Sequence, residues 1–273
     1  MLGKLLKHEF RATGRIMLPL LGVELLLSVL AGLSVRGLDR IGDMSFLGVT
    51  YITTLIVFFL GLFAVGVVAV VLMIQRFYRN LLRDEGYLSM TLPVTVDAHI
   101  WAKLLTSFAW FALEAILSVL AVGVVLSINV SLREELWIWD LFEDFRYYFK
   151  DIRGFNAVLY GLEYLALGFL GTCAFCLRCY ASMAIGHSAA NHKLLLSFVT
   201  WFAIGVALRM IGSVIFVGLV FSDAYLDYLD IFAFEADETT HLFLLLSILG
   251  FALQDVVFYF LTRNFMKNKL NLP

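Results

Sequence analysis

Five ionisable side chains lie inside long apolar stretches of this chain, and they are the residues best placed to carry chemistry. They are Glu24, Glu114, Glu163, Arg209 and Asp255. A charge at the centre of a bilayer costs at least about 2.5–3.5 kcal/mol, so such residues face protein or water and pair with one another. Arg209 keeps its proton. It lies near the middle of its span, as Glu24 and Glu114 do, so one of these two glutamates is its expected partner.

Three interpretations of these residues stay open. They could form a static salt bridge or keep a carboxyl group protonated, they could line a substrate path, or they could couple transport to protons. The sequence contains neither His-Glu-x-x-His nor Gly-x-Ser-x-Gly, and it has no Gly-x-x-x-x-Gly-Lys-[Ser/Thr] loop for ATP. We therefore expect a chain that is not itself an enzyme.

Three cysteines and two histidines have the residue types of a metal site but not its geometry. Cys173, Cys176 and Cys179 recur at steps of three, which drift around a helix axis, and no fourth soft ligand is nearby. We expect them to be small packing residues. His187 and His192 follow the same apolar stretch and are expected to be solvated, so we expect no metal.

The elements that position these residues are membrane spans. Of the 273 residues, 62% are hydrophobic and 15% are charged, and the mean hydropathy is +0.91. A helix needs about 20 mostly apolar residues to cross a bilayer. We therefore expect an all-α, polytopic membrane protein with six transmembrane helices, near residues 16–35, 49–74, 100–128, 155–183, 194–221 and 241–261. In the fourth, Gly168 and Thr172 form a small-xxx-small step that favours close helix approach.

Lys and Arg gather in alternate connecting segments. They mark the N-terminus, the connections after the second and fourth spans, and the C-terminal tail, whereas segments 129–154 and 222–240 are acidic. Because cytoplasmic loops are enriched in Lys and Arg, we expect both termini inside (N-in/C-in), with the acidic segments as outer loops. The net charge of −2 gives no reason to expect a nucleic acid partner.

Residues 1–15 have the pattern of an amphipathic helix that lies in the membrane interface. Apolar residues such as Leu6 and Phe10 share one face, and the basic residues share the opposite face. Glu9 is the exception, because it projects toward the apolar face. Residues 16–273 then form the six-span domain.

One cytoplasmic stretch is distinctive. Residues 80–94 read Asn-Leu-Leu-Arg-Asp-Glu-Gly-Tyr-Leu-Ser-Met-Thr-Leu-Pro-Val, and residues 7–15 read Lys-His-Glu-Phe-Arg-Ala-Thr-Gly-Arg. With these motifs and its six-span layout, the chain resembles the permease subunits of bacterial ABC exporters whose ATPase is a separate chain. Gly86 permits a break and Pro93 ends the segment, as suits a short element that docks on a soluble partner.

This resemblance implies a coupling segment at residues 76–99, with the ATPase contact at Arg83, Asp84, Glu85, Gly86, Tyr87 and Leu88. It also implies that residues 1–15 are the connecting helix of the family. The permease would form a homodimer or heterodimer in the bacterial cytoplasmic membrane. Two ABC ATPase subunits would bind ATP and magnesium, so this chain would need no cofactor of its own.

Other interpretations remain. Residues 83–88 could be only a solvated loop. The chain could be an ATP-independent secondary transporter or channel that uses its intramembrane Glu, Arg and Asp residues, or an intramembrane enzyme with those residues gathered in one cavity. A peptide, a drug, a lipid and a polysaccharide all stay open as substrates.

Overall fold

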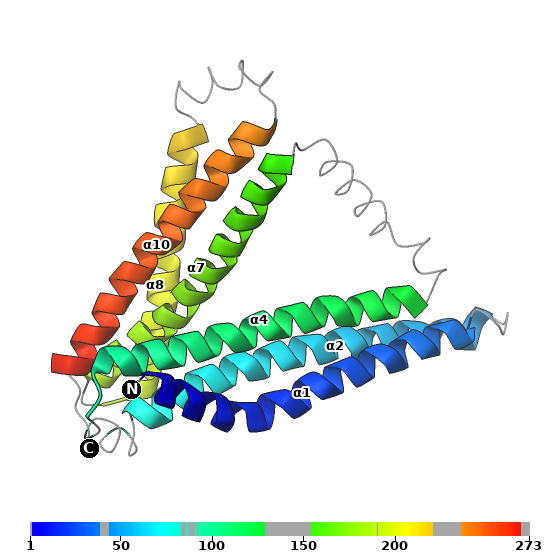
Figure 1. Cartoon of the computed structure of the whole chain (residues 1–273), viewed down its shortest axis with the longest axis horizontal. Coiled ribbons are helices and arrows are strands. Elements are labelled where there is room, and N and C mark those ends of the chain that lie inside the picture. The colour runs from blue at the N-terminus through cyan, green and yellow to red at the C-terminus, as the bar shows by residue number, and fades with distance from the viewer. Residues whose placement is uncertain are drawn as a thin grey trace. The chain divides into compact units, whose positions relative to one another are not determined.

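The computed structural model describes residues 2–38, 44–82, 86, 91, 93–128, 154–189, 191–220 and 236–268. The regular structure in these ranges is helical (Figure 1). Six helices among the described residues are long and apolar enough to cross a bilayer. They confirm the prediction of an all-helical, multi-pass membrane protein. The elements in order are α1 (Leu2–Leu38), α2 (Met44–Phe77), the π-helix η1 (Tyr78–Leu82), α4 (Val96–Ile128), α7 (Gly154–His187), α8 (Lys193–Val220) and α10 (Ala236–Asn268).

Helix α1 joins two elements that the sequence suggested were separate. It runs without interruption from Leu2 to Leu38 and carries Pro19 inside it. In its first four turns Glu9 and Thr13 are buried, and the basic side chains Lys4, Lys7, His8, Arg11 and Arg15 are exposed. The location of this segment in a membrane interface stays a prediction. Of the expected outer loops, only Gly154 and residues 236–240 fall within the described residues.

The chain divides into two compact units. Unit 1 comprises residues 1–73 and 105–157, and unit 2 comprises residues 74–104 and 158–273. Unit 1 therefore holds α1 and most of α2 and α4. Unit 2 holds α8, α10 and all but the first four residues of α7, together with the C-terminal end of α2, η1 and the N-terminal end of α4. The connection between the second and third spans thus belongs to unit 2 at both of its ends.

Small residues bring the three helices of unit 1 together. Ala31, Phe58, Ala121 and Val125 form a buried core between α1, α2 and α4. A Cβ atom added to Gly61 would lie 3.0 Å from Leu27 Cδ1. Because lipid tails are as apolar as Leu, such close packing is the main source of helix association in a membrane.

Two consecutive hydrogen bonds link the start of α1 to α4. The Trp110 indole Nε1 donates a hydrogen bond to Thr13 Oγ1 at 2.8 Å, and the Thr13 hydroxyl donates to the Glu9 carbonyl oxygen at 2.8 Å. Trp110 also lies beside Phe10, with ring centroids 6.1 Å apart. A buried Thr on an otherwise apolar face is thereby explained, because its hydroxyl receives one hydrogen bond and donates another.

Helix α7 is the centre of unit 2, since it contacts both of its neighbours. Arg178 lies 4.3 Å from the ring centroid of Trp201 on α8, a cation–π contact. A Cβ atom on Gly171 would lie 3.8 Å from Phe251 on α10. The three cysteines of α7 are free and buried, in keeping with the expected packing role.

We predict that Thr13→Val weakens unit 1, because it leaves the Trp110 indole N–H without its acceptor in a buried contact. The free energy of unfolding should fall by about 1–3 kcal/mol, measured by titrating bilayer-mimetic micelles with sodium dodecyl sulfate. Thr13→Ser keeps the hydroxyl group, so its free energy of unfolding should fall by clearly less. Equal losses for the two variants would contradict the role given to the Trp110–Thr13 hydrogen bond.

Candidate functional site

The predicted ATPase contact is described only in part. Arg83, Asp84, Glu85, Tyr87 and Leu88 lie outside the described residues, whereas Gly86 is helical and buried. The structure does describe both ends of the connection that carries them. Side chains of unit 2 contact each end of this connection. We call these two groups of contacts the first anchor, around Phe77, and the second anchor, around Asp97, and together they form the candidate functional site.

The first anchor is aromatic and lies where α2 ends. Phe77 is fully buried, and its ring stacks on Tyr180 of α7 with centroids 4.0 Å apart and an interplanar angle of 7°. The next residue, Tyr78, meets the His187 ring edge-on at 5.1 Å. The chain then continues as η1, whose Leu81 and Leu82 are buried. π-Helical turns are rare and often occur at functional sites.

The second anchor begins with a capped helix start. The Thr95 hydroxyl accepts a hydrogen bond from the Ala98 backbone N–H at 3.3 Å, and the Thr95 carbonyl accepts from the same N–H at 3.0 Å. Thr is a favoured N-cap residue, and an acidic residue in the first turn is stabilised by the helix dipole. Asp97 occupies that turn, so local sequence fixes where α4 begins and places a carboxylate there.

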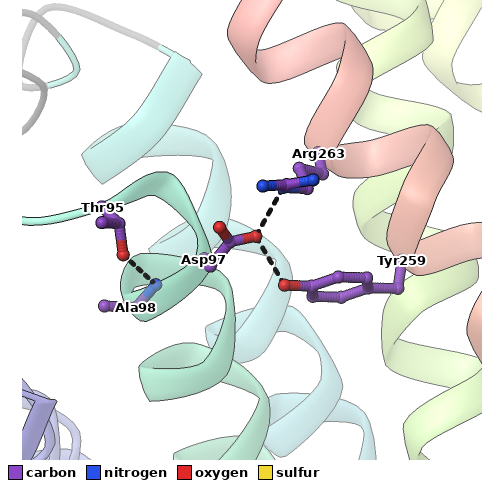
Figure 2. Close-up of polar contacts among 5 residues, drawn as sticks. All are labelled: Thr95, Asp97, Ala98, Tyr259 and Arg263. Carbon is purple, nitrogen blue, oxygen red and sulfur yellow. Dashed lines mark hydrogen bonds and ion pairs between the residues drawn. The ribbon is translucent and has the colours of Figure 1, made fainter.

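Asp97 connects this helix start to α10 (Figure 2). Its Oδ1 accepts a hydrogen bond from the Tyr259 hydroxyl at 2.5 Å and lies 2.8 Å from Arg263 Nε. Tyr259 and Arg263 are four residues apart, so they share one face of α10. Trp101, one turn after Asp97, has its ring 5.9 Å from that of Tyr259. One carboxylate oxygen therefore joins two helices through two donors.

This second anchor positions the connection more than it stabilises the fold. The side chains of Arg263 and Asp97 are 43% and 33% exposed, and an exposed ion pair contributes about 0.2–1 kcal/mol. Screening by salt weakens it further. The Tyr259 hydroxyl adds geometric specificity, because both donors must reach the same oxygen.

The turn between α7 and α8 lies next to the first anchor and depends on one glycine. A Cβ atom on Gly186 would lie 2.6 Å from the Ser197 backbone nitrogen and 2.7 Å from Ser197 Cα. His192, in the turn, has a φ of 54°. Gly186 thus allows the backbones of α7 and α8 to approach each other beside His187.

His187 corrects an expectation from the sequence. It was expected to be solvated, but it is 3% exposed. Its Nδ1 lies 3.0 Å from the Met183 carbonyl oxygen, and its ring packs on Tyr78. Tertiary packing of the connection covers this histidine, and local sequence cannot reveal that. His192 is exposed, as expected.

Of the five intramembrane charges, Glu163 has a partner that the sequence did not suggest. His241 Nδ1 lies 2.7 Å from Glu163 Oε2, and the His241 ring stacks on Tyr160 with centroids 4.0 Å apart. This joins α7 to the start of α10. The pair brings an acid and a base together across 78 residues of sequence.

The other four charges are distributed over both units. Glu24 and Glu114 lie together in unit 1, where Glu24 Oε1 accepts a hydrogen bond from Ser118 at 2.7 Å. In unit 2, Asp255 has a buried Oδ1 without a hydrogen-bond partner among the described residues. Arg209 is exposed on α8, and the described part of unit 2 gives it no ion pair. Its pairing with Glu24 or Glu114 stays a prediction.

Sequence reasoning missed the residues that build the anchors. The sequence pattern gives Asp97, Tyr259 and Tyr180 no role, and it indicates Arg263 only as one of the basic residues near the C-terminus. A local signal existed for the second anchor, because Thr95 and Asp97 form an N-cap and an acidic first turn directly after Pro93. The i, i+4 spacing of Tyr259 and Arg263 was a weaker signal.

Comparisons with protein-family models, with curated proteins and with solved structures found no match to this chain. The fold defines the class of a multi-pass helical membrane protein. Any narrower assignment depends on the residues of the connection and on its anchors.

We predict that Gly186→Ala destabilises unit 2, because the new methyl group would meet backbone atoms of α8 that cannot yield as a flexible side chain would. The melting temperature in lipid nanodiscs should fall, corresponding to about 1–3 kcal/mol. Gly168→Ala is the matched control in the same helix, since nothing lies within 4 Å of a Cβ atom there. Equal melting temperatures for the two variants would contradict the difference in free space between Gly186 and Gly168.

Proposed function

We propose that this chain is the permease subunit of an ATP-driven ABC exporter, coupled to a separate ATPase. The observation that carries the proposal is the connection between α2 and α4. It contains the Asp84-Glu85-Gly86-Tyr87-Leu88 and Thr91-Leu92-Pro93 motifs that resemble those permeases. Its two ends are held by the Phe77–Tyr180 stack and by the bonds of Asp97.

The anchors suggest how force would travel. The first anchor joins the connection to α7, and the second joins it to α10. The ends of the connection belong to unit 2, while most of α2 and α4 belongs to unit 1. A partner that pulled on residues 83–88 would therefore load α7 and α10 through side chains and both long helices through the backbone. Rigid-body movement of packed elements is a common way to switch between two states.

In this proposal the connection faces the cytoplasm of a bacterium, and both termini lie on the same side, as the Lys and Arg distribution indicates. The basic face of residues 1–15 would contact the anionic inner leaflet. The chain would form a dimer with itself or with a similar permease, and ATP and magnesium would bind to the partner ATPase. A secondary transporter would instead move its substrate without that ATPase.

The test is association with an ABC ATPase encoded beside this chain. We predict that Glu85→Ala combined with Tyr87→Ala reduces recovery of the co-expressed ATPase in a pull-down by at least about tenfold, equivalent to about 1.4 kcal/mol. The reason is loss of a charge and of an aromatic ring at the proposed contact. Membrane insertion, measured by the amount of folded chain in the membrane fraction, should be unchanged.

Asp223→Ala combined with Tyr225→Ala is the matched control, because it removes an acid and a tyrosine at the same spacing from an expected outer loop. This variant should bind the ATPase like the unsubstituted chain. Full ATPase recovery with the Glu85/Tyr87 variant would refute the coupling assignment. Transport by the purified chain alone would favour the secondary transporter.

A further inference from the structure

Two carboxyl groups lie near each other among the three helices of unit 1. Glu24 on α1 is 1% exposed, and its Oε1 accepts a hydrogen bond from the Ser118 hydroxyl of α4. Glu114 lies four residues before Ser118, so it is on the same face of α4. A Cβ atom on Gly66 of α2 would lie 3.3 Å from Glu114 Oε1. Three helices therefore converge on this pair, and the two carboxyl groups are close enough to interact electrostatically.

The second carboxyl oxygen of Glu24 has no hydrogen-bond donor among the described residues. Glu24 Oε2 is buried and has no hydrogen-bond partner among the described residues. Ser118 cannot serve it, because its one hydroxyl proton is donated to Oε1. An isolated carboxylate is so costly to bury that such a group becomes neutral instead. A second carboxylate nearby raises that cost through like-charge repulsion.

The spans of unit 1 supply no positive charge. Residues 16–35, 49–73 and 105–128 contain no Lys, Arg or His, and their only other titratable side chain is Tyr51. The nearest basic residues on α1 are Arg15 and Arg36, about 14 and 18 Å from Glu24 along the helix axis. On α4 the nearest is Lys103, about 17 Å from Glu114. The spans of unit 1 therefore offer this pair no basic side chain as a partner.

A proton fits this site and a metal ion does not. Hard cations such as calcium take six to eight oxygen ligands, whereas two carboxyl groups and one hydroxyl meet here. The main-chain carbonyls of α1, α2 and α4 are used within continuous helices. No group of three or more His, Cys, Asp or Glu that could hold a metal occurs among the described residues.

We propose that the pair formed by the fully buried Glu24 and the half-buried Glu114 holds one exchangeable proton at neutral pH, so that the two carboxyl groups share one negative charge. This inference is independent of the exporter assignment. The proton is part of the α1–α4 contact, since its loss would leave two like charges near each other between these helices. Packing at this level is therefore complete while the proton is bound and weakens as the pH rises and the proton leaves.

The test is infrared spectroscopy of the full chain in lipid nanodiscs at pH 7, in H₂O and in D₂O. A protonated carboxyl group gives a C=O stretching band that shifts on deuteration. We expect Glu24→Gln to remove one such band that the unsubstituted chain shows. Glu163→Gln is the matched control, a buried glutamate with a histidine partner, and Arg209→Gln is the control for neutralisation by an arginine. Both should keep the band.

A second measurement does not depend on the folding of a variant. Dicyclohexylcarbodiimide reacts with protonated carboxyl groups in apolar surroundings, and peptide mass spectrometry of the unsubstituted chain should find it on Glu24 or Glu114 at pH 7. The yield should fall as the pH is raised. The proposal fails if Glu24→Gln leaves the carboxyl bands unchanged, if neither glutamate is modified, or if Arg209→Gln creates a new protonated-carboxyl band.

Discussion

Both ends of the α2–α4 connection are held by side chains that come from far along the chain. Phe77 stacks on Tyr180, and Asp97 binds Tyr259 and Arg263, which lie more than 160 residues later. In a bundle of apolar helices, packing of apolar faces alone leaves sliding and rotation weakly defined. A flat ring stack and one carboxylate with two donors define position far better. The placement of this connection, and any function that works through it, depends on these contacts.

The chain handles charge differently in water and in lipid. Asp97 and Arg263 are partly exposed at helix ends, where an ion pair contributes little energy but fixes geometry. Glu163 is buried and has His241 as a partner within the same unit. Glu24 and Glu114 have no basic residue in the spans of unit 1, and in our proposal a shared proton neutralises one of the two carboxyl groups.

Much of the fold follows from the sequence because long apolar runs force helices in lipid. Five of the six helices begin or end within three residues of the expected spans, whereas α10 begins five residues before its expected span and ends seven residues after it. Helix α1 differs at its start, because an amphipathic segment and a span form one helix despite Pro19. The site was harder to predict, because its contacts are long-range. Gly168 matched a small-xxx-small pattern, yet the close backbone approach occurs at Gly186, since only the path of the chain decides which glycine meets a neighbour.

The proposed function requires that the anchored connection faces the cytoplasm, where an ATPase could bind it. Thr91 is an exposed residue of that connection, and the native cysteines are buried in α7. The most direct measurement is labelling of Thr91→Cys with a membrane-impermeant maleimide in vesicles of known orientation. The account predicts reaction in inside-out vesicles and protection in right-side-out vesicles. Reaction only in right-side-out vesicles would place the connection outside the cell and contradict the account.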